Sequence, residues 1–213
     1  RLSPLSFKVN GQEYFNERPI STQQSGFVFV SQMRSTMPDA IGGVLWFGTD
    51  DANMTVFTPV YCCTDKVPVC YSRVDGADYI TFSWNSSFWI FNWVANMVYP
   101  RYDLMIGDVR AFNDAQEGIE SAASKLYSKD PARAKEFLTN YTNMTAQSTL
   151  DTWKRLGEFL IVKYNDGVVK RMKDGKFERN SIGQPAGVIR PGYPKEFLEE
   201  YVKQTGDRYK MPE

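Results

Sequence analysis

Residues 31–61 read SQMRSTMPDAIGGVLWFGTDDANMTVFTPVY, and this stretch decides the expected fold. It contains the end of an apolar strand at Arg34, a turn around Pro38 and a strand with two consecutive glycines. An acidic loop follows, and then a strand that Pro59 interrupts. Strands placed so close together in the sequence predict a sheet as the first part of the fold.

Four strands are expected in this region. The first is rich in aromatic and β-branched residues, and its continuous apolar run predicts burial on both faces. Gly42 and Gly43 permit a bulge or a close backbone approach in the second strand, and Pro59 places the third at an edge or a bulge. The expected strands cover residues 26–34, 41–47, 55–63 and 69–73, after 25 residues that are expected to be extended or irregular.

The period of the apolar residues changes after Gly76. Trp84, Phe88 and Phe91 recur at helical spacing, which predicts a buried helix that Pro100 interrupts. A second helix is expected to continue from there, and a third, much longer one follows. The expected helical segments cover residues 84–99, 102–127 and 131–164.

Local signals set the limits of the long helix. Asp130 is a favourable N-cap and Pro131 suits the first helical position. Residues 139–149 have poor intrinsic helix propensity, so we expect a kink or a break there. Asp166 and Gly167 are expected to stop the helix.

The end of the chain is mixed. Asp174-Gly175 predicts a hairpin turn within residues 168–179, and Pro194 opens a short helix over 195–204. The order of strands, helices and a small hairpin predicts the α+β fold class, with helices packed on a sheet. The expected parts are sheet strands (25–75), a helical layer (83–165) and a hairpin with a C-terminal helix (166–213).

Composition excludes several classes of function. Lys and Arg total 25 and Asp and Glu total 25, so the basic excess that is typical of nucleic-acid binding is missing. The sequence has no His, which excludes Ser-His-Asp and Cys-His catalysis and imidazole-bound zinc within this chain. The most apolar helix, over 88–99, is too short to cross a membrane. We expect no cofactor and no metal site, because the adjacent Asp50 and Asp51 alone make no coordination sphere.

Several blocks of the sequence, taken in their order along the chain, resemble the C-terminal portion of bacterial PepD-like cysteine dipeptidases. These enzymes are N-terminal-nucleophile hydrolases. The block SQMR at 31–34 is similar to the strand that carries the Gln-x-Arg element of this family, and IGGVLW at 41–46 is similar to its Gly-Gly strand. SFWIFNWVAN at 87–96 is similar to its aromatic helix. The remaining blocks are ERPI at 17–20, the Pro turn at Pro38, FTPVY at 57–61 and KYNDG at 163–167.

The resemblance implies an α-β-β-α sandwich of which this chain forms one part. It also implies hydrolysis of dipeptides by an N-terminal Cys, whose own α-amino group acts as the base without imidazole. That Cys is expected upstream of Arg1, in a missing N-terminal portion of the same protein, so the chain alone is expected to be inactive. Cys62, Cys63 and Cys70 are internal and inherit no such role, and the sequence leaves open whether Cys63 and Cys70 are bonded.

Three residues are candidates for substrate binding. Arg34 would clamp a substrate carboxylate through its guanidinium, or else lie at a strand end and pair with Asp39. Asp50 and Asp51 would bind the free ammonium group of a dipeptide, or else be solvated turn residues.

Two other functions stay open. In the first alternative, the chain belongs to an amide hydrolase of the same fold that acts on acylated small molecules. In the second, it is a binding domain without catalysis. A chain that lacks one sheet of a sandwich is expected to expose apolar surface, and therefore to form a homo-oligomer or bind its missing portion. The cellular compartment stays open.

Overall fold

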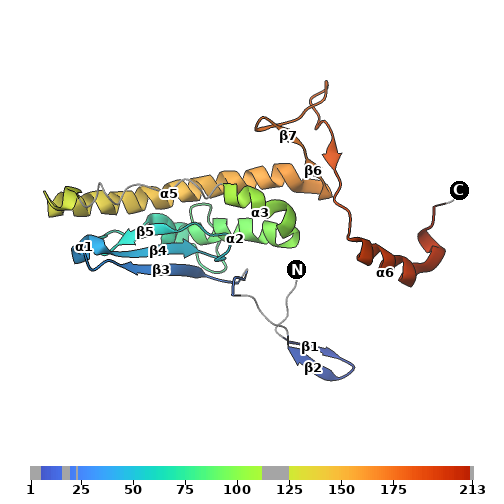
Figure 1. The fold of residues 1–213 in the computed structure, drawn as a ribbon, viewed down its shortest axis with the longest axis horizontal. Coiled ribbons are helices and arrows are strands. Elements are labelled where there is room, and N and C mark those ends of the chain that lie inside the picture. Colours follow the sequence, from blue (N-terminus) through green and yellow to red (C-terminus); the bar gives the residue numbers. More distant parts are fainter. Residues whose placement is uncertain (1–5, 16–19, 23, 112–124, 212–213) are drawn as a thin grey trace. The chain divides into compact units, whose positions relative to one another are not determined.

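The computed structural model describes residues 6–15, 20–22, 24–111 and 125–211. The chain divides into two compact units, Arg1–Glu158 and Phe159–Glu213. Strands occupy the early part and long helices follow them, which confirms the expected α+β class (Figure 1). The block at 17–20 has only its last residue inside the described part, and the expected helix over 102–127 is described only in part.

A three-stranded antiparallel sheet is the centre of the first unit. Its strands are β3 (Phe27–Met33), β4 (Gly43–Thr49) and β5 (Thr58–Tyr61), in the order β3-β4-β5. All seven residues of β3 pair with β4, from Phe27 opposite Thr49 to Met33 opposite Gly43. Pro59 lies on β5 at the border of the sheet, as expected, because an edge strand tolerates a missing N–H donor.

The predicted burial of the first strand is wrong. Six of the seven residues of β3 are exposed, and Met33 retains 78% of its accessible surface. β3 is the other border strand and pairs only with β4, while α5 lies near the opposite border, at β5 (Figure 1). The apolar sequence of β3 therefore has no cover in the part of the chain that the structure describes.

Two of the other predicted strands also differ from the structure. The second starts at Gly43, because Asp39–Gly42 forms one helical turn, α1, before the ladder begins. The prediction of a fourth strand is wrong, because Val69–Tyr71 forms a 3-10 helix. Tyr71 explains the difference, since its hydroxyl donates to Thr58 Oγ1 at 2.7 Å and its ring contacts Phe47.

Gly43 makes the predicted close backbone approach. A Cβ built on Gly43 would lie 2.4 Å from the Sγ of Cys62, which is far inside van der Waals contact. A Cβ on Gly42 would lie 2.9 Å from the carbonyl oxygen of Arg34. Both glycines therefore allow the α1 turn and β4 to lie close to neighbouring backbone and side chains.

The helices of the first unit are α2 (Ser87–Val98), α3 (Tyr102–Ala111) and most of α5 (Pro131–Tyr164). α2 buries Ile90, Val94 and Val98 almost completely and ends before Pro100, as expected. Asp130 accepts a hydrogen bond from the Arg133 N–H at 3.0 Å, which confirms the predicted N-cap of α5.

The predicted break in the long helix is wrong, since α5 is continuous over its 34 residues. Thr142 is fully buried and donates to the carbonyl oxygen of Pro59 at 2.8 Å, so it is bonded to the sheet. Leu138 packs with Ile41, Val44 and Tyr61 in a core cluster. Tertiary packing of this segment overrides its weak helix propensity.

Two hairpins have turn residues at positive φ. β7 (Met172–Lys173) pairs with β8 (Lys176–Phe177) around Asp174 and Gly175, which confirms the predicted turn. β1 (Ser6–Val9) pairs with β2 (Gln12–Phe15) around Asn10-Gly11, so of the two expected states, extended or irregular, this part adopts the extended one, as a hairpin that was not predicted. The Asn-Gly dipeptide is the signal that would have predicted this hairpin.

The second unit contains the end of α5 and short elements after it. Asp166 and Gly167 have positive φ and stop α5, as predicted. β6 (Val169–Lys170) pairs with β9 (Val188–Ile189), and α6 (Lys195–Thr205) exposes its apolar residues. Further short helices in the part of the chain that the structure describes are Val69–Tyr71, Val74–Gly76, Tyr99–Arg101, Asn165–Gly167 and Gly206–Tyr209.

Candidate functional site

A cavity of about 620 Å³ opens in the first unit, where the ends of β3 and β4 meet the start of α2. The segment from Cys70 to Tyr79 forms its third side. The volume lies inside the range that is usual for small-molecule sites, roughly 300–1,000 Å³. Size and position make this cavity the best candidate for a binding site in the part of the chain that the structure describes.

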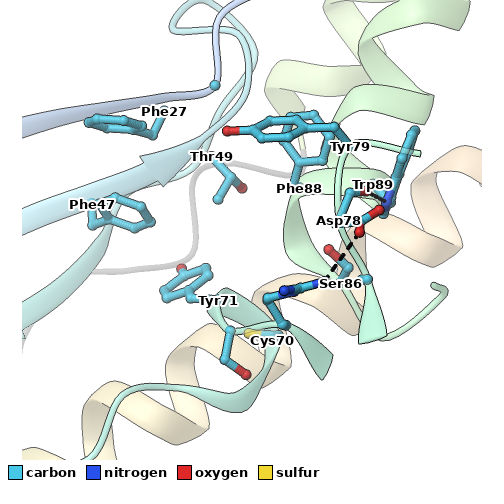
Figure 2. Close-up of a pocket in the computed structure, with 14 residues that line it drawn as sticks. Phe27, Phe47, Thr49, Cys70, Tyr71, Asp78, Tyr79, Ser86, Phe88 and Trp89 are labelled. Atoms are coloured by element: carbon cyan, nitrogen blue, oxygen red, sulfur yellow. Dashed lines mark hydrogen bonds and ion pairs between the residues drawn. The ribbon is translucent and has the colours of Figure 1, made fainter. Parts of the chain in front are cut away.

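Six aromatic residues line the cavity. Phe47 contacts Phe27 and Tyr71 from the sheet side, with ring centroids 6.0 and 5.0 Å apart. Tyr79 contacts Phe88 edge-on at 6.1 Å, and these rings lie beyond Thr49 (Figure 2). The two groups of rings come from different elements and leave an apolar space between them.

Hydrogen bonds fix the segment that closes the cavity. The indole N–H of Trp89 is directed at the carbonyl oxygens of Asp78, at 3.0 Å, and Thr81, at 2.7 Å. The guanidinium of Arg73 donates to the carboxylate of Asp78 at 3.2 Å, as the dashed line in Figure 2 shows. The hydroxyl of Tyr71 is held by Thr58. These hydrogen bonds hold the cavity wall in place.

Polar groups gather where α2 begins. Ser86 is the N-cap residue of α2, lines the cavity and is only 5% exposed, yet its side chain makes no capping hydrogen bond. The first intrahelical bond runs from the Ile90 N–H to the Ser86 carbonyl oxygen at 3.1 Å, so the N–H groups of Ser87, Phe88 and Trp89 have no acceptor within the helix. Donors without helical partners thus lie at one end of an apolar cavity.

The titratable side chains deep in the cavity are neutral at pH 7. Burial raises the pKa of the Cys70 thiol to about 11 and raises the pKa of the Tyr71 phenol well above its usual range. Among the described residues that line the cavity, the charged ones are Arg73 and Asp78, which form an ion pair. The interior therefore carries no unpaired side-chain charge.

The two acids that the sequence singles out are buried. Asp50 and Asp51 are each 1% exposed, so the alternative that they are solvated turn residues is wrong. Asp50 accepts a hydrogen bond from Asn92 Nδ2 at 2.8 Å, and Asp51 accepts from the Asn53 N–H at 2.8 Å and from the hydroxyl of Ser21. The Oδ2 atom of each carboxylate has no hydrogen-bond partner among the described residues.

The environment of Asp50 disfavours its charge. Burial raises the pKa of Asp50 from 3.8 to about 6, while the hydrogen bond from Asn92 partly opposes this rise and the neighbouring Asp51 adds to it. Its backbone is also in the left-handed region, with φ at 68°. Such a carboxyl group changes its protonation state near neutral pH.

Arg34 lies at the other end of the sheet from the acid pair. Its Nη2 donates to the Ile41 carbonyl oxygen at 3.2 Å and its Nε to that of Gly42 at 3.4 Å, so it stabilises the end of the α1 turn. Gly43, near Arg34, and Thr49, next to the acid pair, are six residue steps apart on β4, which is about 20 Å. The structure thus brings Asp50 and Asp51 together but not Arg34, and substrate binding by these three residues stays a prediction.

All three cysteines are free thiols. Cys70 is buried, Cys63 is half-buried and Cys62 is exposed. Burial raises the pKa of Cys63 as well as that of Cys70, whereas cysteine nucleophiles have lowered pKa values.

The sequence did not reveal the cavity, because its wall comes from four separated segments and no periodic pattern marks the segment from Ser72 to Tyr79. Ser86 had a usable signal, since a Ser directly before an apolar helix is a favourable N-cap. The described residues contain no group of three or more acids or cysteines placed to hold a metal ion. No helix in the described part is long and apolar enough to cross a membrane.

The aromatic cavity gives this α+β domain a candidate small-molecule site, and a fold of this kind hosts many functions. The comparison with protein families supplies the class, because the model for peptidase family C69 matches residues 4–115, more than half of the chain. The chain therefore belongs to peptidase family C69, which confirms the predicted resemblance to a peptidase family. No curated protein matches the chain.

Proposed function

We propose that this chain is the C-terminal portion of a cysteine dipeptidase whose nucleophile is a Cys upstream of Arg1. The family match over residues 4–115 carries the proposal. In this mechanism the thiolate attacks the peptide carbonyl, and the α-amino group of the same Cys takes and returns the proton. Donors on the protein then stabilise the oxyanion.

The chemistry within the chain supports a nucleophile from outside it. The sequence has no His, so no imidazole activates a Ser or a Cys in this chain. Burial holds the thiols of Cys63 and Cys70 in their protonated form at neutral pH. A Cys at the start of the mature chain needs neither imidazole nor a buried thiol, because its amine supplies the base.

The exposed surface of β3 supports a covering portion. Phe27, Phe29 and Val30 each keep more than half of their accessible surface, and Met33 keeps more still. Contiguous apolar residues on an unpaired strand border are unusual in a complete domain, since they favour association. In the proposed α-β-β-α sandwich, the upstream portion of the same protein covers this surface.

Asp50 and Asp51 remain the proposed residues for the ammonium group of the substrate, and Arg34 stays a separate prediction because it lies about 20 Å from them. The unpartnered Oδ2 atoms of the two acids would be satisfied by the ammonium group of a dipeptide. A dipeptide extends roughly 7 Å, so Arg34 would not bind the carboxylate of a dipeptide whose ammonium group is held by the acid pair. Arg34→Lys and Asp51→Asn, measured as separate changes in KM and kcat of the full-length protein, test these roles.

The decisive experiment uses the natural full-length protein after expression. N-terminal sequencing and intact mass establish whether the mature chain begins with Cys and continues through Arg1 to Glu213. A panel of dipeptides and N-acyl amino acids then establishes the activity, with the first Cys changed to Ser as the control. A mature protein without an N-terminal Cys, or one that cleaves only acylated small molecules, would overturn the proposal.

A further inference from the structure

We propose that the cavity beside α2 binds an amino acid with an aromatic side chain and a free α-carboxylate. The ring would occupy the space between the two groups of aromatic residues, and the carboxylate would lie at the N-terminus of α2. In the full-length protein this residue would be the C-terminal one of a dipeptide, and only this last step rests on the proposed function.

The walls suit a flat apolar group. Phe47 and Tyr71 lie on one side and Tyr79 and Phe88 on the other, and both pairs already contact edge-on. Aromatic rings prefer edge-on or offset contacts at centroid distances of roughly 4.5–7 Å, and such pairs add to the burial of apolar surface. A ligand ring between these pairs would meet neighbours on both faces, whereas a methyl side chain would leave most of about 620 Å³ to water.

The start of α2 suits an anion. The unpaired N–H groups of Ser87, Phe88 and Trp89 and the helix dipole favour negative charge at this end of a 12-residue helix. Ser86 is a second and separate indication, because the residue is only 5% exposed, lines the cavity and makes no capping bond. A carboxylate there would accept hydrogen bonds that the protein does not satisfy by itself.

The other charges of the cavity do not oppose this arrangement. Arg73 and Asp78 neutralise each other, and the Cys70 thiol and the Tyr71 phenol are uncharged at pH 7. A ligand ammonium group would find no free carboxylate among the described lining residues. The cavity therefore selects a carboxylate over an amine at the end near α2.

The first test is binding to the 213-residue chain without any reaction. N-acetyl-L-phenylalanine is titrated against the chain by calorimetry and by tryptophan fluorescence, since Trp89 is in the wall. N-acetyl-L-phenylalanine amide removes the charge, and N-acetyl-L-alanine removes the ring. We expect the first ligand to bind at least tenfold more tightly than either of the others. Equal affinities, or no binding of the first ligand, would overturn the proposal.

Two pairs of variants test the location. Tyr79→Ala removes a ring that is 87% exposed, so it is expected to weaken N-acetyl-L-phenylalanine binding at least fivefold without lowering the thermal midpoint. Ile80→Ala, at the equally exposed next position outside the cavity, is the matched control and is expected to leave affinity unchanged. Equal effects of the two variants would place the ligand elsewhere and refute the assignment.

The second pair isolates the charge at α2. Ser86→Asp and Ser86→Asn are nearly equal in size and both suit an N-cap, so the helix is expected to form in each. The Asp side chain places its own carboxylate where the ligand carboxylate would lie. We expect Ser86→Asp to bind at least tenfold more weakly than Ser86→Asn at pH 8. Equal affinities would refute the carboxylate position.

A comparison of substrates separates this inference from the proposed function. If the full-length protein hydrolyses dipeptides but treats Ala-Phe and Ala-Ala alike in kcat/KM, the proposed function stands and this cavity is not its specificity site. If the chain binds N-acetyl-L-phenylalanine selectively but the full-length protein cleaves no dipeptide, the binding site stands and the proposed function fails.

Discussion

Replacing Asp50 with Asn changes one buried charge and little else. Asp50 is 1% exposed, and one of its carboxylate oxygens has no partner among the described residues. Asn has nearly the same shape, its carbonyl oxygen still accepts the bond from Asn92, and it tolerates the left-handed φ of 68° better than most residues. The variant therefore removes the cost of a buried carboxylate while keeping the local structure.

The magnitude follows from the pKa of Asp50. Burial raises this pKa from 3.8 to about 6, a difference of about two units, or about 3 kcal/mol at 1.36 kcal/mol per unit. A raised pKa in the folded state means that the contribution to stability is complete below pH 3.8 and is lost as pH rises through about 6. The wild-type protein thus loses stability at this residue between those pH values, and the Asn variant does not.

The assay is urea unfolding of both proteins at pH 4 and pH 8. We expect Asp50→Asn to be more stable than wild type by about 3 kcal/mol at pH 8, and the difference to shrink to below about 1 kcal/mol at pH 4. Asp174→Asn is the matched control, because Asp174 also has positive φ but lies exposed in a hairpin turn. A difference that does not change with pH, or a variant less stable at pH 8, would refute the reasoning.

Two substitutions and one labelling experiment test contacts and burial within the first unit. Gly43→Ala places a Cβ 2.4 Å from the Sγ of Cys62 and is expected to cost about 1–3 kcal/mol of unfolding free energy, and Cys62→Ala in the same chain is expected to recover most of it. Arg34→Ala removes two hydrogen bonds to the end of α1 and is expected to cost about 1–3 kcal/mol in urea unfolding, with Arg34→Lys recovering less than half. Cys70 is buried and its pKa is raised to about 11, so a thiol reagent is expected to modify it about tenfold more slowly than Cys62. Mass spectrometry of the native chain measures both rates, and equal rates would contradict the burial of Cys70.

Local signals predicted the parts of the fold that depend on backbone geometry. Pro59 lies on a border strand because its missing N–H is harmless there, and Asp174-Gly175 forms a turn because both residues accept positive φ. These requirements hold whatever packs around them. Residues 69–71 and the centre of α5 differ because Tyr71 and Thr142 bond to the sheet, and a tertiary contact of this kind leaves no periodic signal in the sequence.

The candidate site was harder to predict than the fold. Asp50 and Asp51 have the sequence of a solvated turn, yet Asn92, from a helix about 40 residues later, is the partner that keeps Asp50 inside. The cavity depends on the same kind of distant meeting, since β4 provides one wall and α2 the other. Composition shows which residues favour burial or hydrogen bonding, but only the fold shows which partners they meet.

The apolar sequence of β3 has a different meaning. Its hydrophobicity predicted burial, and the structure leaves it exposed at the border of the sheet. Hydrophobic sequence reports what a strand would bury in its complete assembly, and the described chain buries both ends of β4 and most of β5 but leaves β3 exposed. The failed prediction is therefore an argument for the covering portion that the proposed function requires.

Binding and chemistry are separable in this arrangement. Every residue that lines the cavity lies between Gly26 and Trp89, inside the region that matches peptidase family C69, and the wall is held by hydrogen bonds within that region. The proposed nucleophile lies upstream of Arg1. Selective binding of an aromatic amino acid is therefore expected in the chain as it stands, while hydrolysis is expected only when the first Cys is present. Hydrolysis of a dipeptide by the 213-residue chain alone would refute this division.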